Sequence, residues 1–438
     1  MKRENKKVLL IFNLVEYPTR ITLKEHLLSF KKYSGHSVYY LNFFFSRKTL
    51  RWLLNSVEFD LVIFHHSFTN HWYEFLFRRD LNFLKKLHFK NAVKAAFFQD
   101  EYHHSDWKCR LINELGIEYV FSVANESEFK NIYNGVNHQK VKFIQVLTGY
   151  IDEEQITKVQ RLEKKVTRTV DIGYRAFGQA PFKLGRFGML KKEIGDRFNQ
   201  AAPQRGLKTD ISTRENRFLE GDQWYEFLLR CKYVLGVESG ASLLDRSGEI
   251  SNRIDNYVLS SKTLPSFEEV EANCFPGMDG NLNLKTISPR HFEACLTKTC
   301  QILMEGDYSG LLKPDVHYIP LKKDFSNLEE VLAKVKEDRH RENIVENCRR
   351  DILLSGKYTY KAFAEQVFSS INFPANSKGA SRKDIWMLRV TQLIFYADLA
   401  TAFVFKKVIS PVYNTTVATA GRERINKVLS KFFGLGRR

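Results

Sequence analysis

Residues 287–324 read ISPRHFEACLTKTCQILMEGDYSGLLKPDVHYIPLKKD. The pair Ser288-Pro289 is typical of a helix start, because serine caps free backbone N–H groups and proline fits the first helical position. The apolar runs at Gln301–Glu305 and His317–Pro320 have the length of buried strands. This stretch therefore predicts a helix followed by two strands of an α/β domain.

The same alternation extends along the rest of the chain. Short apolar, β-branched or aromatic runs alternate with stretches of helical periodicity, a pattern that favours an α/β protein with largely parallel sheets. The other expected strands are Val8–Val15, Ser37–Asn42, Leu61–His66, Lys94–Gln99, Tyr119–Val123, Val141–Val146, Val170–Tyr174, Lys208–Ser212 and Tyr233–Val237.

Helices are expected between these strands and after the last of them. Ser326 and Glu329 stand three residues apart, which is the spacing of a capping box at a helix start. The expected helices include Leu23–Lys32, Asp106–Leu115, a helix from Asp324 or Ser326 to about Val335, Arg339–Ser355 and Tyr358–Asn372.

A charged stretch, EEQITKVQRLEKK, interrupts the pattern and is typical of a solvated connector. A length of 438 residues is enough for two or three domains. We expect an N-terminal Rossmann-like domain over residues 1–150, a connector over 151–168, a second Rossmann-like domain over 169–373 and a basic helical tail over 374–438.

Charge and cysteine usage narrow the class of protein. The chain has 68 Lys and Arg against 50 Asp and Glu, a net charge of +18, which indicates an anionic partner. Residues 374–438 hold twelve of these cations and three acids, and so carry half of the excess. The six cysteines form no CxxC pair, and no signal-peptide cleavage pattern follows the basic start. These features predict a cytoplasmic protein without a structural zinc.

The tail begins with a strongly apolar stretch, Ile385–Ile409. Arg389 and Asp398 lie inside it, and charges are costly in the middle of a spanning helix, so we expect no transmembrane segment. Aromatic and basic residues, and the final GRERINKVLSKFFGLGRR, favour a peripheral helix on an anionic membrane surface. A helix pair packed on the body of the protein is the alternative.

The quoted stretch also carries chemistry. The first turn of its helix places Ser288, Arg290 and Glu293 beside free N–H groups, and such a helix end can receive a diphosphate. A carboxylate nearby can accept hydrogen bonds from ribose hydroxyls. We therefore expect a nucleotide site here.

The motifs SPRHFE, EGDYSGLL and HYIPLKKDFSN resemble the C-terminal domain of GT-B glycosyltransferases of bacterial polysaccharide clusters, including the CgeB-like group. The resemblance covers roughly residues 171–331. It implies a GT-B fold, with two Rossmann-like domains facing a cleft, and a nucleotide-sugar donor whose ribose is held by Glu293. The family pattern has an earlier glutamate at the position that Lys285 occupies in this chain.

Further donor-binding candidates follow from the same resemblance. The segment DIGYRAFG places Gly173 and Arg175 where GT-B enzymes have a glycine-rich turn and a basic residue for the donor phosphates, and Lys183 is expected to assist. A surface ion pair is the alternative for Arg175. Donor-binding residues are also expected in VLGVESGASLLD, at a strand end, namely Glu238, Ser239 and Ser242.

The candidate catalytic residues lie in the first domain. Asp100 and Glu101 follow an expected strand directly, and His66 ends another, so all three should reach the ligand edge of the sheet. Asp100 is the first choice for a general base that deprotonates an acceptor hydroxyl, with Glu101 and His66 as further candidates. A helix cap or an ion pair is the alternative for Asp100, and Arg20 is a candidate ligand of phosphate or acceptor.

Several signatures are missing from the sequence. It has no Walker loop, no GxGxxG that opens a helix, no HExxH and no GxSxG, which weakens kinase, dehydrogenase, metalloprotease and hydrolase interpretations. No DxD follows an expected strand, so we predict a mechanism without metal or cofactor.

The prediction is therefore transfer of a hexosyl or related group from a nucleotide sugar to a glycan or lipid-linked acceptor. The expected setting is surface polysaccharide biosynthesis of the O-antigen or capsule type. A sugar-nucleotide epimerase of the same fold is an alternative. A nucleic-acid-binding protein is a further one, which the net charge favours and the missing recognition module disfavours.

Overall fold

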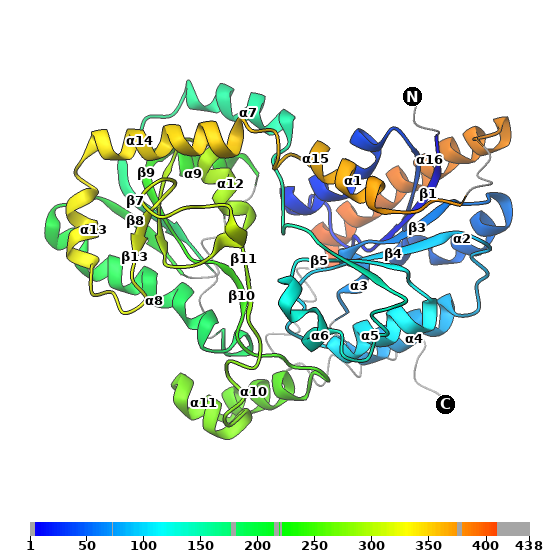
Figure 1. Ribbon diagram of the computed structural model, residues 1–438, viewed down its shortest axis with the longest axis horizontal. Coiled ribbons are helices and arrows are strands. Elements are labelled where there is room, and N and C mark those ends of the chain that lie inside the picture. The colour runs from blue at the N-terminus through cyan, green and yellow to red at the C-terminus, as the bar shows by residue number, and fades with distance from the viewer. Residues whose placement is uncertain are drawn as a thin grey trace.

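We describe the protein from a computed structural model. The structure describes residues 5–71, 73–176, 181–213, 219, 221–374 and 379–409. It contains two α/β domains side by side, the first in blue and cyan and the second in green and yellow in Figure 1. Two helices near the C-terminus, coloured orange, return to the first domain.

The first domain is built on a six-stranded sheet in which every strand pair is parallel, in the order β2-β1-β3-β4-β5-β6. Both faces of this sheet are covered, which explains why its strands are continuous apolar runs instead of alternating ones. The strands are β1 (Lys7–Phe12), β2 (Ser37–Asn42), β3 (Leu61–Phe64), β4 (Val93–Phe98), β5 (Tyr119–Ser122) and β6 (Lys142–Gln145).

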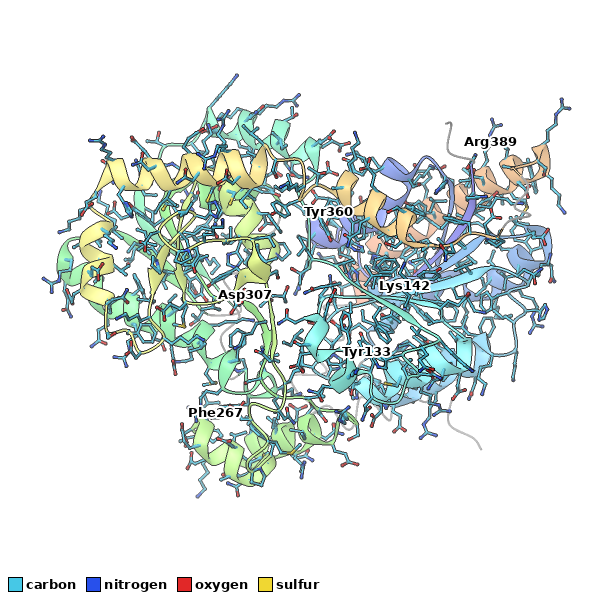
Figure 2. All side chains as sticks on the ribbon, in the orientation of Figure 1. Tyr133, Lys142, Phe267, Asp307, Tyr360 and Arg389 are labelled. Atoms are coloured by element: carbon cyan, nitrogen blue, oxygen red, sulfur yellow. The ribbon has the colours of Figure 1, made fainter. Side chains whose placement is uncertain are left out.

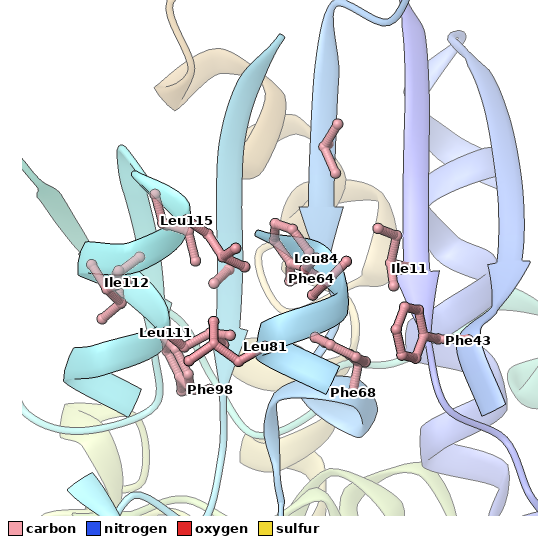
Figure 3. Close-up of a cluster of buried hydrophobic side chains, with 14 of the residues drawn as sticks. Ile11, Phe43, Phe64, Phe68, Leu81, Leu84, Phe98, Leu111, Ile112 and Leu115 are labelled. Atoms are coloured by element: carbon pink, nitrogen blue, oxygen red, sulfur yellow. The ribbon is translucent and has the colours of Figure 1, made fainter. Parts of the chain in front are cut away.

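Helices pack on the two faces of the first sheet. One face is covered mainly by α2, α4 and α5, and Figure 3 shows the aromatic and aliphatic core beneath them, with Phe64, Phe68 and Leu81 among its members. The other face packs against α1, where Phe97 and Phe121 stack with their ring centroids 4.5 Å apart. The helices are α1 (Ile21–Ser34), α2 (Phe43–Ser56), α3 (His66–Thr69), α4 (Glu74–Leu84), α5 (Ser105–Leu115) and α6 (Phe129–Ile132).

The second domain has a five-stranded parallel sheet in the order β13-β12-β9-β7-β8. Its strands are β7 (Val170–Arg175), β8 (Thr209–Ser212), β9 (Cys231–Gly236), β12 (Cys300–Met304) and β13 (Ile319–Leu321). The helices around it are α7 (Glu153–Glu163), α8 (Arg186–Ala201), α9 (Asp222–Arg230), α12 (Pro289–Leu296), α13 (Leu328–Lys334) and α14 (Asp338–Cys348).

An extension of the second domain docks on the first. It consists of an antiparallel pair, β10 (Ser239–Ala241) and β11 (Leu284–Thr286), with α10 (Glu249–Ser260) and α11 (Phe267–Cys274). The backbone of His104 donates to Asp245 at 2.7 Å, and that of Asp245 donates to Tyr102 at 2.7 Å. Leu244 and Leu282 join the core of the first domain, so the two domains share apolar packing.

The last two described helices belong to the first domain. α15 (Tyr360–Ser370) packs against α1, and its Phe363 and Val367 enter the core of the first sheet. α16 (Arg382–Val404) runs beside β2. The expected second domain over residues 169–373 is thus corrected: the chain crosses back near residue 359, because α15 is needed to cover α1 and the first sheet.

The predicted strands agree with the observed ones to within two residues at each end, except that the first ends at Phe12, three residues before the predicted Val15. The capping box at Ser326 was wrong: α13 begins later, and its N-cap residue Asn327 makes no side-chain cap bond. The expected connector is largely the helix α7, which contacts α9 of the second domain. The basic end of the predicted tail, residues 421–438, lies outside the described residues.

Candidate functional site

A pocket opens at the carboxyl ends of β7 and β9, beside the start of α12. Its cavity volume is about 280 Å³, and its walls come from the second domain except for Arg20 of the first. Ligands of open parallel sheets bind at this edge of the strands. Four cationic side chains line the pocket, namely Arg20, Arg175, Lys191 and Arg290.

Arg175 is held rigidly in this wall. Its guanidinium pairs with the Asp210 carboxylate at 2.7 Å, donates to the Asp210 carbonyl at 2.8 Å and lies over the Phe227 ring at 4.2 Å. Its Nε is buried without a hydrogen-bond partner among the described residues. Arg175 therefore lines the pocket as predicted. However, the guanidinium N–H groups that were expected to bind a diphosphate are bonded to Asp210.

Arg290 and Lys191 face the pocket with more freedom. Arg290 donates to the Arg175 carbonyl, and its guanidinium lies 5.3 Å from the centre of the Trp224 ring. Lys191, from α8, makes no ion pair with a described residue. Burial and, to a lesser extent, nearby Arg290 lower the pKa of Lys191 to about 8, while Asp100 opposes the shift. A bound anion would stabilise the charged form of this lysine.

The helix start predicted at Ser288 is confirmed. The Ser288 side chain accepts from the backbone N–H of Arg290 at 3.4 Å, and Pro289 is the first residue of α12. Ser288 and Arg290 both line the pocket, so the positive end of this helix faces the cavity. The helix end and the cationic side chains therefore surround one cavity, an arrangement that favours anions.

Glu293 lies one turn further along α12 and, unlike Ser288 and Arg290, is not among the residues that line the pocket. One carboxylate oxygen accepts from the Trp224 indole N–H at 2.7 Å. Burial raises the pKa of Glu293, while Trp224 and Arg290 lower it. Across the domain boundary, Glu25 of α1 has its pKa raised to about 8, by burial first and then by Asp152 and Glu293.

Glu238 and Ser239 line the pocket as expected, but the Glu238 carboxylate is bonded to the backbone of a neighbouring loop. Its buried carboxylate accepts the backbone N–H groups of Asp307 at 3.1 Å and Tyr308 at 2.8 Å. This fixes the loop after β12 against β9. Figure 2 labels Asp307 on the side of the second domain that faces the first.

Three further predicted donor-binding residues, besides Glu293, lie away from the pocket lining. Gly173 is inside β7 instead of in a turn. An added Cβ would lie 2.9 Å from Phe227 and closer still to Cys231, so tight packing explains why a glycine stands at this position. Lys183 pairs with Asp255 at 2.7 Å. The Ser242 hydroxyl hydrogen-bonds Asp279 at 2.8 Å and holds a loop. None of the three lines the pocket.

Asp100 stands at the end of β4 with a left-handed backbone, φ 51°. Solvent reaches its carboxylate, which accepts from the Asn70 amide at 3.1 Å. Desolvation by the surrounding protein raises the pKa of Asp100. The charges of Lys108, Lys191 and Arg20 and the hydrogen bond from Asn70 oppose this shift. Asp100 does not itself line the pocket, but it interacts electrostatically with Lys191 and Arg20, which do.

Glu101 is not available as a base. It is fully buried, and it accepts from the Ser122 hydroxyl and from the Tyr133 hydroxyl at 2.6 Å. Burial raises its pKa to about 7, and the buried Lys108 opposes this shift. The left-handed turn at Asp100 directs these two neighbouring carboxylates to opposite sides, one to solvent and one to the core.

His66 belongs to a cluster with His26 and His65, whose ring nitrogens lie within 4.8 Å of one another. Three imidazoles are a common ligand set for transition metals. However, Nδ1 of His26 and Nε2 of His65 share one hydrogen at 2.8 Å, and Nδ1 of His65 accepts from the backbone of Ser67. A metal here would displace one of these bonds. Burial lowers the pKa of His66 to about 3, so it is neutral.

Two pocket residues had no signal in the sequence. Lys191 is one of two neighbouring lysines in an amphipathic helix, and only the helix orientation brings it to the cavity. Trp224 of α9 lines the pocket directly, and its indole N–H donates to Glu293. Arg20, a candidate from its place after the first strand, does line the pocket.

No family model and no curated protein matches the sequence. Among solved structures, HepE of Anabaena in complex with UDP-glucose is 9% identical with a TM-score of 0.46, over 84% of this chain and 100% of that one. An α-glucosyltransferase in complex with UDP and DNA is 10% identical with a TM-score of 0.47, over 84% and 99%. Sucrose-phosphate synthase of Thermosynechococcus elongatus is 9% identical with a TM-score of 0.44, over 84% and 98%.

Such distant likenesses say nothing about the reaction of this chain. The two parallel sheets, with the pocket at the strand ends of one and Asp100 of the other beside it, have the predicted GT-B architecture. The closer resemblance to the CgeB-like group stays a prediction.

Proposed function

We propose that the protein transfers a sugar from a nucleotide-sugar donor to a hydroxyl group of an acceptor. The observation that carries this proposal is the cluster of Arg20, Arg175, Lys191 and Arg290 around one cavity, at the strand ends and at a helix N-terminus. Such a site fits a diphosphate, because charge-assisted hydrogen bonds and the helix dipole both favour a compact polyanion.

In this proposal the donor diphosphate lies against Arg290, Lys191 and the start of α12, and Arg20 closes over it from the first domain. Glu293 accepts a hydrogen bond from the ribose, as the family resemblance implies, through the oxygen that Trp224 does not use. The cations then stabilise the negative charge that develops on the leaving diphosphate, which is the usual source of rate enhancement in such a step.

Asp100 is our candidate for the general base. The acceptor hydroxyl oxygen would form a bond to the anomeric carbon while the bond from that carbon to the diphosphate oxygen breaks. The hydroxyl proton passes to Asp100, and the bonding electrons leave with the diphosphate. The exposed carboxylate beside the pocket supports this role, and a raised pKa brings a carboxylate nearer to the operating pH of a base.

The finer assignments are part of the same proposal. The acceptor is a glycan or a lipid-linked glycan of surface polysaccharide biosynthesis, the transferred group is a hexose or a related sugar, and no metal is required. The protein works in the cytoplasm. An epimerase acting on the same nucleotide sugar would use the same pocket without an acceptor.

The experiment compares Asp100→Asn with Asp106→Asn, a neighbouring exposed aspartate on α5. Asparagine tolerates the left-handed backbone at position 100, so this change should not disturb the fold. We expect Asp100→Asn to lose at least about 100-fold in transfer rate with unchanged nucleotide affinity, and Asp106→Asn to keep both. Full turnover by Asp100→Asn would refute the assignment. Epimerisation without an acceptor would replace the proposed reaction with the alternative.

A further inference from the structure

Helix α16 presents an unusual outer face. Seven of the eleven exposed large hydrophobic side chains in the described residues lie on it or on the turn after it. Leu393 is 70% exposed and Trp386 59% exposed. The seven are Ile385, Trp386, Leu393, Tyr396, Phe403, Val404 and Val408. Scattered apolar residues are ordinary on a surface, but a concentration on one helix marks a site of contact.

The inner face of the same helix is part of the fold. Phe395 stacks on Tyr40 of β2 with ring centroids 5.0 Å apart, and Met387 joins the core on the α2 side of the sheet. Asp384 lies 3.6 Å from Lys7, and Asp398 accepts from the Ser46 hydroxyl of α2 at 2.8 Å. Helix α16 is therefore fixed along the edge strand of the first sheet.

Charge on this helix is sorted between the two faces. Its two acids, Asp384 and Asp398, are both buried against the body. The cations Arg382, Lys383, Arg389 and Lys407 are exposed. Figure 2 shows Arg389 near the right-hand end of the molecule, away from the second domain. The outer face therefore combines apolar side chains with positive charge and shows no acid.

We propose that this outer face of α16 docks on the surface of an anionic membrane, with the helix lying in the plane of that surface. Tryptophan and tyrosine favour the headgroup region, leucine and phenylalanine enter the acyl boundary, and Lys and Arg attract acidic lipids. A protein partner would have to offer an acidic apolar groove, whereas an anionic bilayer offers both properties over any length.

The helix lies on the membrane in this proposal and does not cross it. Residues 382–408 are long and apolar enough to span a bilayer by length and composition. A span would place Asp384 and Asp398 in lipid and strip α16 from β2, with loss of the Lys7 and Ser46 contacts. Buried charges in lipid are costly, and the in-plane position keeps every one of these contacts.

The C-terminal end of α16 contacts the segment that leads to the pocket residue Arg20. The Tyr17 backbone N–H donates to the Ala402 carbonyl at 3.3 Å, and Lys406 donates to the Pro18 carbonyl at 2.9 Å. These residues precede Arg20, which lines the pocket. Docking through α16 would thus hold the first-domain side of the pocket close to the membrane. If the proposed function holds, an acceptor carried in the same membrane would reach Asp100 there.

The test is co-sedimentation of the full chain with vesicles of phosphatidylcholine alone or with phosphatidylglycerol added, without nucleotide. The apolar variant is Trp386→Ser/Leu393→Ser/Tyr396→Ser. Its matched control is Leu259→Ser/Leu264→Ser/Leu354→Ser, three exposed hydrophobic residues of the second domain and the segment that follows it. A charge variant, Lys383→Glu/Arg389→Glu, is matched by Lys262→Glu/Lys357→Glu. Retained helical content and unfolding temperature show that each variant folds.

We expect wild type to bind the anionic vesicles and not the neutral ones. The apolar and charge variants should each lose more than about tenfold in affinity, since each cation near the surface contributes about 1 kcal/mol, or about fivefold. The controls should bind like wild type. Unchanged binding by both α16 variants would overturn the proposal, and so would resistance of the bound protein to alkaline carbonate, which marks a spanning helix. Because no nucleotide is present, either result is independent of sugar transfer.

Discussion

Lys191 gives the sharpest prediction about the pocket. Its ammonium is partly buried beside Arg290, and its pKa in the free protein is about 8. A diphosphate bound against it favours the charged form and would return the pKa toward its ordinary value of about 10.5. Binding of the nucleotide therefore takes up a proton between about pH 8 and about pH 10.5, and affinity must fall as the pH rises through that range.

The size of the effect follows from the two pKa values. From about pH 7.5 to about pH 9.5 the protonated fraction of free Lys191 falls roughly 25-fold while the bound form stays mostly charged. The dissociation constant of a nucleoside diphosphate should rise about twentyfold over this range, or about 1.8 kcal/mol.

The assay is isothermal titration calorimetry at several pH values in buffers of different ionisation enthalpy, which also counts the protons taken up. Lys191→Arg keeps the charge without titrating and should flatten the dependence. Lys192→Arg, the next residue on the same helix, should retain it, because Lys192 pairs with Asp196 instead. A dissociation constant that is independent of pH in wild type, or a dependence that survives Lys191→Arg, would refute this reasoning.

Two further predictions concern stability. Gly173→Ala should destabilise the fold by about 1–3 kcal/mol in urea denaturation, because the new Cβ overlaps Cys231 and Phe227. Gly379→Ala should be neutral, because a Cβ there meets nothing within 4 Å. Equal stability of the two variants would contradict the packing role of Gly173. Glu25 holds its proton up to about pH 8 in the folded state and only to about 4.5 when unfolded, so its contribution to stability falls as the pH rises between these values. In Glu25→Gln the pH-dependent loss of stability should be smaller by about 1–2 kcal/mol, after allowance for partial exposure. If the variant keeps the wild-type dependence of unfolding free energy on pH, Glu25 ionises normally in the folded protein.

Local patterns made much of the fold predictable. Strands buried on both faces are continuous apolar runs, so their positions followed from the sequence, and the start of α12 followed from Ser288-Pro289. The placement of α15 did not follow, because its apolar face fits a core in either domain. In the structure the chain crosses back, and Phe363 and Val367 of α15 pack with α1 in the core of the first domain.

The site was less predictable because its residues meet through tertiary contacts. Lys183 looked free for a phosphate, but Asp255 from a helix 72 positions away neutralises it. Glu101 looked like a base beside Asp100, but the turn directs it to Ser122 and Tyr133. Lys191 lines the pocket only because of the orientation of α8. Charge and strand ends pointed to the edge of the second sheet at which the pocket opens, and packing decided which side chains reach that pocket.

Nucleotide binding by the pocket is the central claim, and calorimetric titration with a panel of purine and pyrimidine nucleoside diphosphates tests it most directly. We expect at least one of them to bind wild type and the Lys183→Ala control alike. Arg290→Ala should bind the same nucleotide about 10- to 100-fold more weakly, as loss of a charge-assisted contact predicts. Failure of every nucleotide to bind, or equal affinity in Arg290→Ala, would contradict the account.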